Sequence, residues 1–144
     1  MSARTIAIAT DHAGFELKEM LKQDIENMGL KVADLGTNGT PSVDYPDFAG
    51  EMAKWIQHNP EQVGVLICGS GIGMSMAANR HRHVRAALCH NAAAASLARR
   101  HNNANVLCLG ARMIGAEVAK FCLKHFLETD FEGGRHQKRI DKFS

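Results

Sequence analysis

Short apolar runs and longer amphipathic segments alternate along the chain. The apolar runs occupy residues 5–10, 31–35, 63–68, 84–89 and 105–109, and each has the length of a single strand. Most of them carry apolar residues at successive positions, which is typical of strands that are covered on both faces. The pattern therefore predicts five buried strands.

The segments between these strands have helical spacing. A first helix follows Phe15 and ends at Gly29, and a second ends near Asn59-Pro60. A third follows the strand at 63–68, and Asn91 is placed to cap a fourth over 92–100. A fifth helix is predicted over 114–127. The apolar faces expected for the first and last of these comprise Leu17, Leu21, Ile25 and Met28, and Val118, Phe121, Cys122 and Phe126.

Five strand–helix alternations favour an α/β fold. We expect a three-layer α/β/α doubly wound, Rossmann-like domain with a five-stranded parallel sheet, formed by residues 1–144 as one unit. The tail over 128–144 is polar and basic, with a short last helix. No internal repeat or linker interrupts the pattern.

In such folds the functional site lies at the carboxyl ends of the strands. This rule predicts that five segments meet at one edge of the sheet. They are Asp11-His12, the loop 36–46, residues 68–73, His90-Asn91 and residues 110–112.

Composition narrows the class of protein. A formal charge of +2 over 144 residues gives no indication of nucleic-acid binding. No signal peptide and no apolar run of membrane-spanning length is evident, and the four cysteines form no CxxC pair. We therefore expect a cytoplasmic protein with reduced thiols.

The stretch 63–75 combines a buried strand, three alternate glycines and the start of a helix. Unpaired N–H groups and the positive end of the helix dipole favour an anion at such a turn. The spacing is not the dinucleotide fingerprint, and no G-K-[ST] follows, so neither a nicotinamide cofactor nor a P-loop is indicated. The alternative is a turn that only lets the helix pack closely against the sheet.

Cys68 immediately precedes these glycines. A thiol beside a helix N-terminus can act as a nucleophile or a general base. The alternative is an inert buried thiol, which is also the interpretation for Cys89, Cys108 and Cys122.

Other candidates are ambiguous by pattern alone. Asp11 can be a helix cap, and His101 can be a surface residue at a helix C-terminus. Arg135 and Arg139 lie four apart, as two phosphate-binding guanidiniums on one helix face would, or as part of a solvated tail. No spacing among the eight histidines resembles a metal site.

Several motifs, in order and at matching spacing, resemble the type B ribose-5-phosphate isomerases, a family that also includes galactose-6-phosphate isomerase subunits. The similarity runs from about Ile6 to Arg139. The motifs are Thr10-Asp11-His12-Ala13-Gly14-Phe15, Asp44-Tyr45-Pro46, Ile67-Cys68-Gly69-Ser70-Gly71-Ile72-Gly73, Arg100-His101-Asn102-Asn103-Ala104-Asn105 and Glu132-Gly133-Gly134-Arg135-His136-Gln137-Lys138-Arg139.

The resemblance implies an aldose–ketose isomerase. Cys68 would be the base that moves a proton from C2 to C1 through a cis-enediolate, and His101 would be the acid that opens the sugar ring. Ser70 occupies the position of a helper hydroxyl that is commonly a threonine. The developing oxyanion would be stabilised by the backbone of Gly69, Ser70, Gly71, Ile72 and Gly73.

The resemblance also implies the substrate contacts. Asp11 would hold sugar hydroxyls and Asn102 a substrate oxygen. The phosphate would be held by His12, Arg112, Arg135 and Arg139. No cofactor and no metal are implied, and the site would be completed across the interface of a homodimer, or of a tetramer.

Some family members carry serine at the Cys68 position and use a glutamate just after the glycine loop as base. Here that later position is Met74, which cannot accept a proton. The chain therefore resembles the cysteine subgroup.

Three alternatives remain open. The substrate can be a hexose 6-phosphate, such as allose 6-phosphate or galactose 6-phosphate, because one hydroxymethyl group gives only about 1–3 kcal/mol of discrimination. The domain can bind a phosphosugar without catalysis. The basic tail can bind RNA or DNA, although no RNP-like pattern accompanies it.

Overall fold

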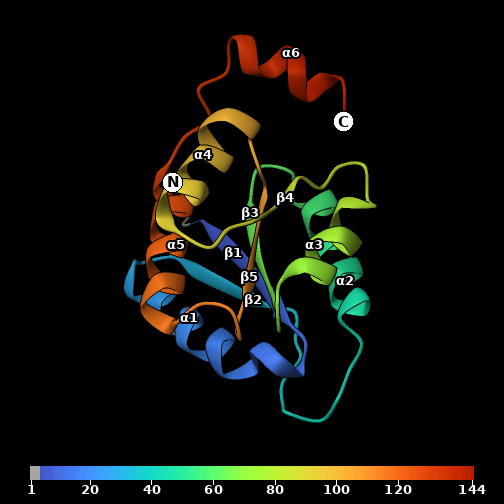
Figure 1. The fold of residues 1–144 in the computed structure, drawn as a ribbon, viewed down its shortest axis with the longest axis vertical. Helices are drawn as coiled ribbons and strands as arrows, with labels where there is room; N and C mark the ends of the chain where they lie inside the picture. The colour runs from blue at the N-terminus through green and yellow to red at the C-terminus, as the bar shows by residue number, and fades with distance from the viewer. Residues whose placement is uncertain (1–3) are drawn as a thin grey trace.

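The computed structural model describes residues 4–144. Five parallel strands form one sheet in the order β2-β1-β3-β5-β4, and helices cover both of its faces (Figure 1). The predicted doubly wound α/β/α architecture is confirmed. The strands are β1 (Thr5–Thr10), β2 (Lys31–Asp34), β3 (Val63–Cys68), β4 (Ala86–Leu88) and β5 (Val106–Gly110). The helices are η1 (His12–Gly14), α1 (Phe15–Asn27), α2 (Tyr45–His58), α3 (Ile72–Asn79), α4 (Ala92–Asn102), α5 (Ala116–Glu128) and α6 (Arg135–Asp141).

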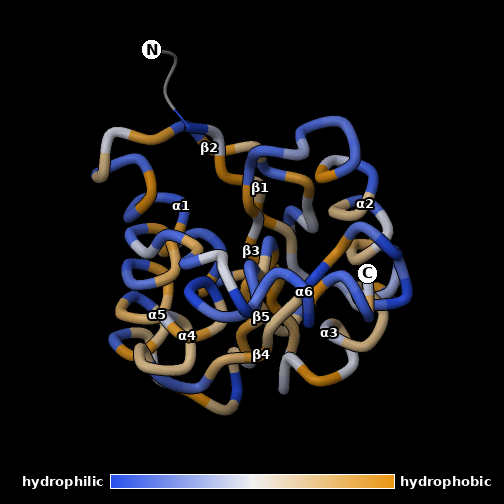
Figure 2. Tube along the Cα trace, turned by 90° about the horizontal axis from the view of Figure 1, so that it is seen from above, coloured by the Kyte–Doolittle hydropathy of each residue, from blue (hydrophilic) through white to orange (hydrophobic). Residues whose placement is uncertain are grey.

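Two apolar layers sandwich the sheet. Helices α1, α4 and α5 bury their apolar side chains with Ile6, Ile8 and Leu107 on one face. Helices α2 and α3 pack with Ala7 and Leu66 on the other. Seen from the α6 end, the five strands lie in order between these two groups of helices, and α6 crosses in front of them (Figure 2).

Strands β1, β3 and β5 are the buried centre of the sheet. All residues of β3 and β5 are buried, as their uninterrupted apolar runs predict. The edge strand β4 is shorter than predicted, because only residues 86–88 pair with β5. The chain crosses from β3 past β5 to β4 and then returns from β4 to β5. Because these two crossovers run in opposite directions, α3 and α4 lie on opposite faces of the sheet.

The predicted apolar face of α5 is partly wrong. Val118 and Phe121 are 38% and 54% exposed, whereas Cys122 and Phe126 are buried. The buried stripe of α5 consists of Ala119, Cys122, Leu123, Phe126 and Leu127. Met28 likewise lies just beyond the end of α1 and is 39% exposed.

Two predicted helix ends are confirmed. Gly29 follows α1 with a φ of +80°, a conformation that glycine adopts without strain. The Asn91 side chain accepts a hydrogen bond from the Ala94 N–H at 2.8 Å and so caps α4.

Lys18 is fully buried on α1 although it is charged. Its Nζ donates to both carboxylate oxygens of Asp34, at 2.7 Å each, and to Asn38 at 3.2 Å. This ion pair fixes α1 against the end of β2, beside the loop that leads to the carboxyl edge of the sheet.

Candidate active site

The carboxyl edge of the sheet brings together the predicted segments Asp11-His12, 68–73 and 110–112. The predicted loop 36–46 joins them, since the Thr10 N–H donates to the Gly36 carbonyl at 2.8 Å. Thr10 pairs with Ile67, and Cys68 pairs with Gly110, so the residues after each strand emerge side by side. The Asp11 N–H donates to the Ile67 carbonyl at 3.2 Å, and the Arg112 N–H donates to the Gly69 carbonyl at 2.9 Å. The sheet-edge rule thus places Asp11, Cys68 and Arg112 at one edge.

The glycine loop between β3 and α3 packs directly on β5. Gly71 has a φ of +79°, and a Cβ added there would lie 2.5 Å from Leu88 Cδ1 and 3.0 Å from the carbonyl carbon of Leu109. Only glycine satisfies both the backbone angle and the space. The loop therefore packs closely against the sheet, as the alternative interpretation of its glycines predicted. This packing is also compatible with an anion site.

Cys68 lies at the mouth of this loop, facing the α2–α3 layer, and is 5% exposed. Its sulfur accepts a hydrogen bond from the Gly71 N–H at 3.1 Å. A backbone donor is thus aimed at the sulfur at the N-terminal end of α3.

Burial changes the pKa of the other three cysteine thiols. Burial raises the pKa of the Cys89 thiol to about 12, with a smaller contribution from Cys122. Burial also raises the pKa of Cys108 and of Cys122. At neutral pH these thiols stay protonated, in agreement with their interpretation as small buried hydrophobes.

Two of the five loop N–H groups are used within the loop itself. Gly71 donates to Cys68, and Ile72 donates to the Ser70 hydroxyl oxygen at 3.2 Å. The candidate donors to a substrate oxygen are therefore the N–H groups of Gly69, Ser70 and Gly73. Ser70 keeps its own hydroxyl proton for donation.

His12 and Arg112 are the predicted phosphate ligands on this edge. The His12 Nδ1 accepts a hydrogen bond from the Val43 N–H at 3.2 Å, which leaves Nε2 as the protonated nitrogen of the neutral ring. A Cβ on Gly69 would lie 3.3 Å from a guanidinium nitrogen of Arg112, so the arginine side chain lies over the loop. Asp11 is 6% exposed and caps η1 by accepting from the Ala13 N–H at 2.9 Å.

Tyr45 is a residue of this edge to which the sequence assigned no role. A Cβ on Gly73 would lie 2.6 Å from the Tyr45 hydroxyl, so the phenol packs against the glycine loop. Tyr45 begins α2, far from the loop in sequence. The motif Asp44-Tyr45-Pro46 marked this residue in the sequence, but only the fold shows that Tyr45 contacts the loop at Gly73.

The remaining predicted site residues lie at the opposite edge of the sheet. Helix α4 runs antiparallel to the strands, so its last residues, His101 and Asn102, lie at the amino ends, just before β5. Arg135 and Arg139 are on α6, which packs on the end of α4. Figure 1 shows α6 at the top of the molecule and the loop between β2 and α2 at the bottom. One chain therefore does not bring these four residues to Cys68.

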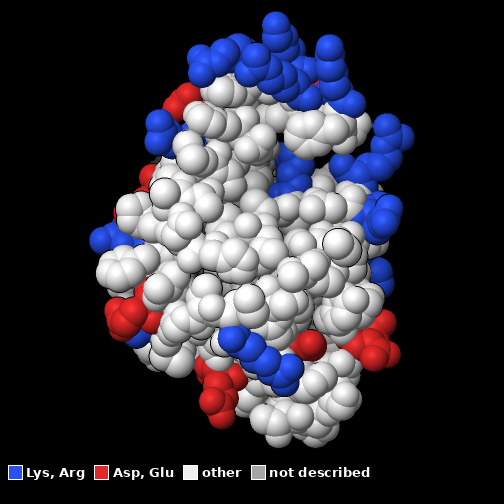
Figure 3. Space-filling model, viewed as in Figure 1, with Lys and Arg blue, Asp and Glu red and all other residues white. Residues whose placement is uncertain are grey.

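Basic side chains gather at the α6 end of the molecule (Figure 3). Arg135, Lys138 and Arg139 on α6 are exposed, and Lys142 follows the helix. Such a concentration of positive charge attracts anions to this end.

Three potential metal ligands also meet here, which no spacing in the sequence indicated. Atoms of His101, Glu132 and His136 lie within 4.8 Å of one another. The two imidazole rings are stacked, with an angle of 17° between their planes. Lone pairs that lie in two stacked, nearly parallel planes do not converge on one ion, so this arrangement does not indicate a metal site.

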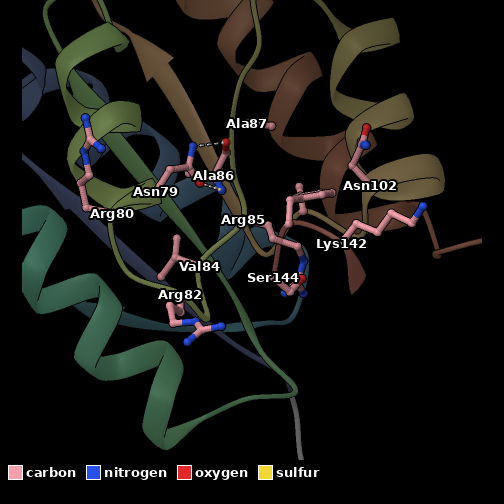
Figure 4. A pocket seen from close by; sticks show the side chains of 12 residues that line it. Asn79, Arg80, Arg82, Val84, Arg85, Ala86, Ala87, Asn102, Lys142 and Ser144 are labelled. Carbon is pink, nitrogen blue, oxygen red and sulfur yellow. Dashed lines mark hydrogen bonds between the residues drawn. The ribbon is translucent and has the colours of Figure 1, made fainter. Parts of the chain in front are cut away.

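A cavity of about 590 Å³ opens beside this edge, between the end of α3 and the residues after α6 (Figure 4). Arg80, Arg82, Arg85 and Lys142 are among its lining residues. In Figure 4 the Arg80 and Arg82 side chains point in different directions, and Lys142 points away from both. The side chains of Arg80, Arg82 and Lys142 therefore do not converge on one point of the cavity.

No helix within residues 4–144 is long and apolar enough to cross a bilayer.

Comparison with known proteins identifies the family. The family model described as ribose/galactose isomerase matches residues 6–143. A putative sugar phosphate isomerase of Rickettsia conorii is 46% identical over 142 residues, covering 99% of both chains. The ribose-5-phosphate isomerase B of Escherichia coli K12 is 39% identical over 138 residues, covering 96% of this chain and 93% of the relative.

Solved structures agree with the sequence relatives. A ribose 5-phosphate isomerase of Thermotoga maritima has a TM-score of 0.95 at 51% identity, with 99% of this chain and 98% of the other covered. The ribose-5-phosphate isomerase B of Mycoplasma genitalium with bound ribulose 5-phosphate has a TM-score of 0.94 at 43% identity, with 99% and 95% covered. The family model, the relatives and the shared fold all extend over almost the whole chain, which therefore belongs to the ribose/galactose isomerase family.

Proposed function

We propose that the chain interconverts ribose 5-phosphate and ribulose 5-phosphate, with Cys68 as the base. The observation that carries this proposal is the position of the Cys68 sulfur, which accepts the Gly71 N–H at the carboxyl edge of the sheet, in a chain whose relatives are ribose-5-phosphate isomerases. A relative of 43% identity is described with ribulose 5-phosphate bound.

The proton transfer uses groups of this edge. Cys68 takes the C2 proton of the open-chain aldose, which forms a cis-enediolate. The O2 hydroxyl proton then passes to the neighbouring O1, and Cys68 returns its proton to C1, which leaves the C2 carbonyl of the ketose. The N–H groups of Gly69, Ser70 and Gly73 stabilise the charge on the enediolate oxygen. Met74, at the position where some relatives carry a glutamate, is fully buried and has no proton-accepting group.

We further propose that two copies of the chain complete each site. His101, Asn102, Arg135 and Arg139 lie at the opposite edge from Cys68. Two copies related by a twofold axis, packed side by side in opposite directions, would bring one chain's amino edge to the other's carboxyl edge. His101 of one chain would then open the sugar ring, and its arginines would join His12 and Arg112 of the other at the phosphate.

Exposed apolar side chains beside the glycine loop support this pairing. Ile72 and Met76 on α3 are 48% and 63% exposed, and Met113, next to Arg112, is 61% exposed. A second chain packed here would remove these side chains from water.

The second candidate substrate is a hexose 6-phosphate, since the family model includes galactose isomerases. Comparison of kcat/KM on ribose 5-phosphate, allose 6-phosphate and galactose 6-phosphate decides between them. We expect ribose 5-phosphate to give the highest value. A higher kcat/KM on either hexose phosphate would make that sugar the assigned substrate. If none of the three sugars were turned over, the chain would be a domain that binds a phosphosugar without catalysis.

A further inference from the structure

A compact network surrounds His101 at the end of α4. The His101 ring stacks on the ring of His136, with 4.5 Å between centroids and 17° between planes. Glu132 joins the tail to α4, because its N–H donates to the Arg100 carbonyl at 3.1 Å and its Oε2 accepts from the Arg100 side chain at 3.1 Å. The other carboxylate oxygen of Glu132 lies 3.4 Å from His136 Nε2.

His136 has no role in the reaction proposed above. It is 7% exposed, and its Nε2 is buried without a well-aligned hydrogen-bond partner among the described residues. A buried imidazole with an incompletely satisfied nitrogen costs free energy, and the fold retains it directly against the proposed acid. Its neighbours Arg135 and Gln137 on α6 are exposed by contrast.

We propose that His136 is a positioning residue that holds the His101 ring, through their stacked faces, in the orientation from which His101 opens the cyclic sugar. This inference rests on the proposed function. Glu132, tied to Arg100, limits how the His136 ring can move, and so supports the stack.

Ring opening needs this support more than the later proton transfer does. In opening, the C1–O4 bond breaks, O4 takes a proton from His101, and the O1 hydroxyl gives its proton to solvent water as the aldehyde forms. An imidazole at a helix end is free to rotate, and a proton donor must lie within hydrogen-bond reach of the ring oxygen. The carboxylate needed beside the stack is ionised, since the hydrogen bond from Arg100 lowers the pKa of Glu132.

The two steps can be measured apart. Ribulose 5-phosphate cannot form a furanose ring because its C5 oxygen carries the phosphate, so exchange of its C1 proton with D₂O requires the base but no ring opening. For His136→Ala we expect turnover of ribose 5-phosphate to fall by about tenfold to a hundredfold. We expect the C1 exchange on ribulose 5-phosphate, followed by NMR, and the KM for this ketose to stay within about twofold of the wild type.

His136→Phe separates stacking from other roles. It keeps an aromatic face against His101 and is expected to recover most of the lost turnover. Gln137→Ala, on the same helix but exposed, is the matched control and should leave both measurements unchanged.

Three results would overturn the proposal: unchanged ribose 5-phosphate turnover in His136→Ala, an equal loss of C1 exchange in that variant, or no recovery by His136→Phe. An equal loss would mean that α6 as a whole had moved, together with the phosphate ligands Arg135 and Arg139. A failure of the proposed function is distinct, because the wild type itself would then show neither turnover nor exchange.

Discussion

The backbone N–H of Gly71 donates a hydrogen bond to the sulfur of Cys68 at 3.1 Å. The donor is a backbone group of one tight loop, and the acceptor is the buried thiol three residues before it, so the conformation of the loop determines the geometry. The same loop packs on β5 with no room for a side chain at Gly71. The position of the thiol and the packing of the loop on the sheet therefore both depend on the conformation of Gly71.

Removal of the thiol should stop the proton transfer without removing the binding site. In Cys68→Ala we expect turnover and C2 proton exchange to fall by about 10²–10⁴-fold, the usual effect of losing a general base. Binding of ribose 5-phosphate, measured by calorimetry, should remain detectable. Cys89→Ala is the control, since its buried thiol has a pKa raised to about 12 and should not contribute. Undiminished turnover in Cys68→Ala would rule out the cysteine as base.

The proposed division of the site between two chains predicts that two inactive variants restore each other. Cys68→Ala damages one edge of the sheet and His101→Ala the other. When the two are co-refolded, half of the dimers are mixed and half of the sites in each mixed dimer are intact, so about one quarter of the wild-type activity should return. The control mixes Cys68→Ala with Arg112→Ala, whose lesions share an edge, and should show no recovery. If the first mixture also stayed inactive, each chain would have to carry its own complete site.

Glycine at position 71 is expected to be required for folding as well as catalysis. Gly71→Ala forces a Cβ against Leu88 at a φ of +79°, and we expect a loss of more than about 1 kcal/mol of unfolding free energy with a loss of activity. Gly50→Ala is the opposite case, because nothing lies within 4 Å of a Cβ in the interior of α2. That change should stabilise the fold by about 0.5–1 kcal/mol. Denaturant titration of both variants measures the difference, and equal effects would contradict the packing described for the loop.

The buried Lys18–Asp34 pair predicts how stability depends on acid. Burial alone would raise the pKa of Asp34, but the hydrogen bonds from Lys18 and Lys22 outweigh it and hold the pKa below its ordinary value of 3.8. A carboxyl whose pKa is lowered by folding contributes stability that is complete above pH 3.8 and lost as the pH falls through the lower, folded value. The wild type should therefore lose stability on acidification in this range.

Asp34→Ala should cost about 3–5 kcal/mol at neutral pH, because it removes the two closest acceptors of the buried Lys18 ammonium. It should also flatten the pH dependence below pH 3.8. Glu51→Ala removes an exposed carboxylate that lies 3.6 Å from Lys54 and should change stability by less than about 1 kcal/mol. An Asp34 variant as stable as the Glu51 variant would show that the buried pair is not strengthening the fold.

The alternation of apolar runs and amphipathic segments was sufficient to predict the sheet, its helices and the carboxyl edge. The parallel register then brings Asp11, Cys68 and Arg112 together, as predicted from strand ends alone. Lys18 shows the limit of this reasoning. A lysine between Leu17 and Leu21 is predicted to be solvated, and its burial depends on acceptors that are distant in sequence, Asp34 and Asn38.

The second half of the proposed site, with His101 and Arg135, was predicted by resemblance and not by position. His101 and Arg135 carry no local signal that separates a site residue from a surface cation. Their place at the amino edge follows from the direction of α4 and from the packing of α6 on it. That packing depends on contacts such as the stacked rings of His101 and His136, which join segments that no periodicity relates.

The opposed positions of Cys68 and His101 have a consequence for how the rate depends on the amount of protein. A reaction centre assembled from two chains exists only while the chains are associated, so mass action governs the number of centres. For the proposed dimer, the rate under dilution should fall with the square of the chain concentration once dissociation dominates. Saturating phosphosugar should delay that fall, because the proposed phosphate ligands come from both chains.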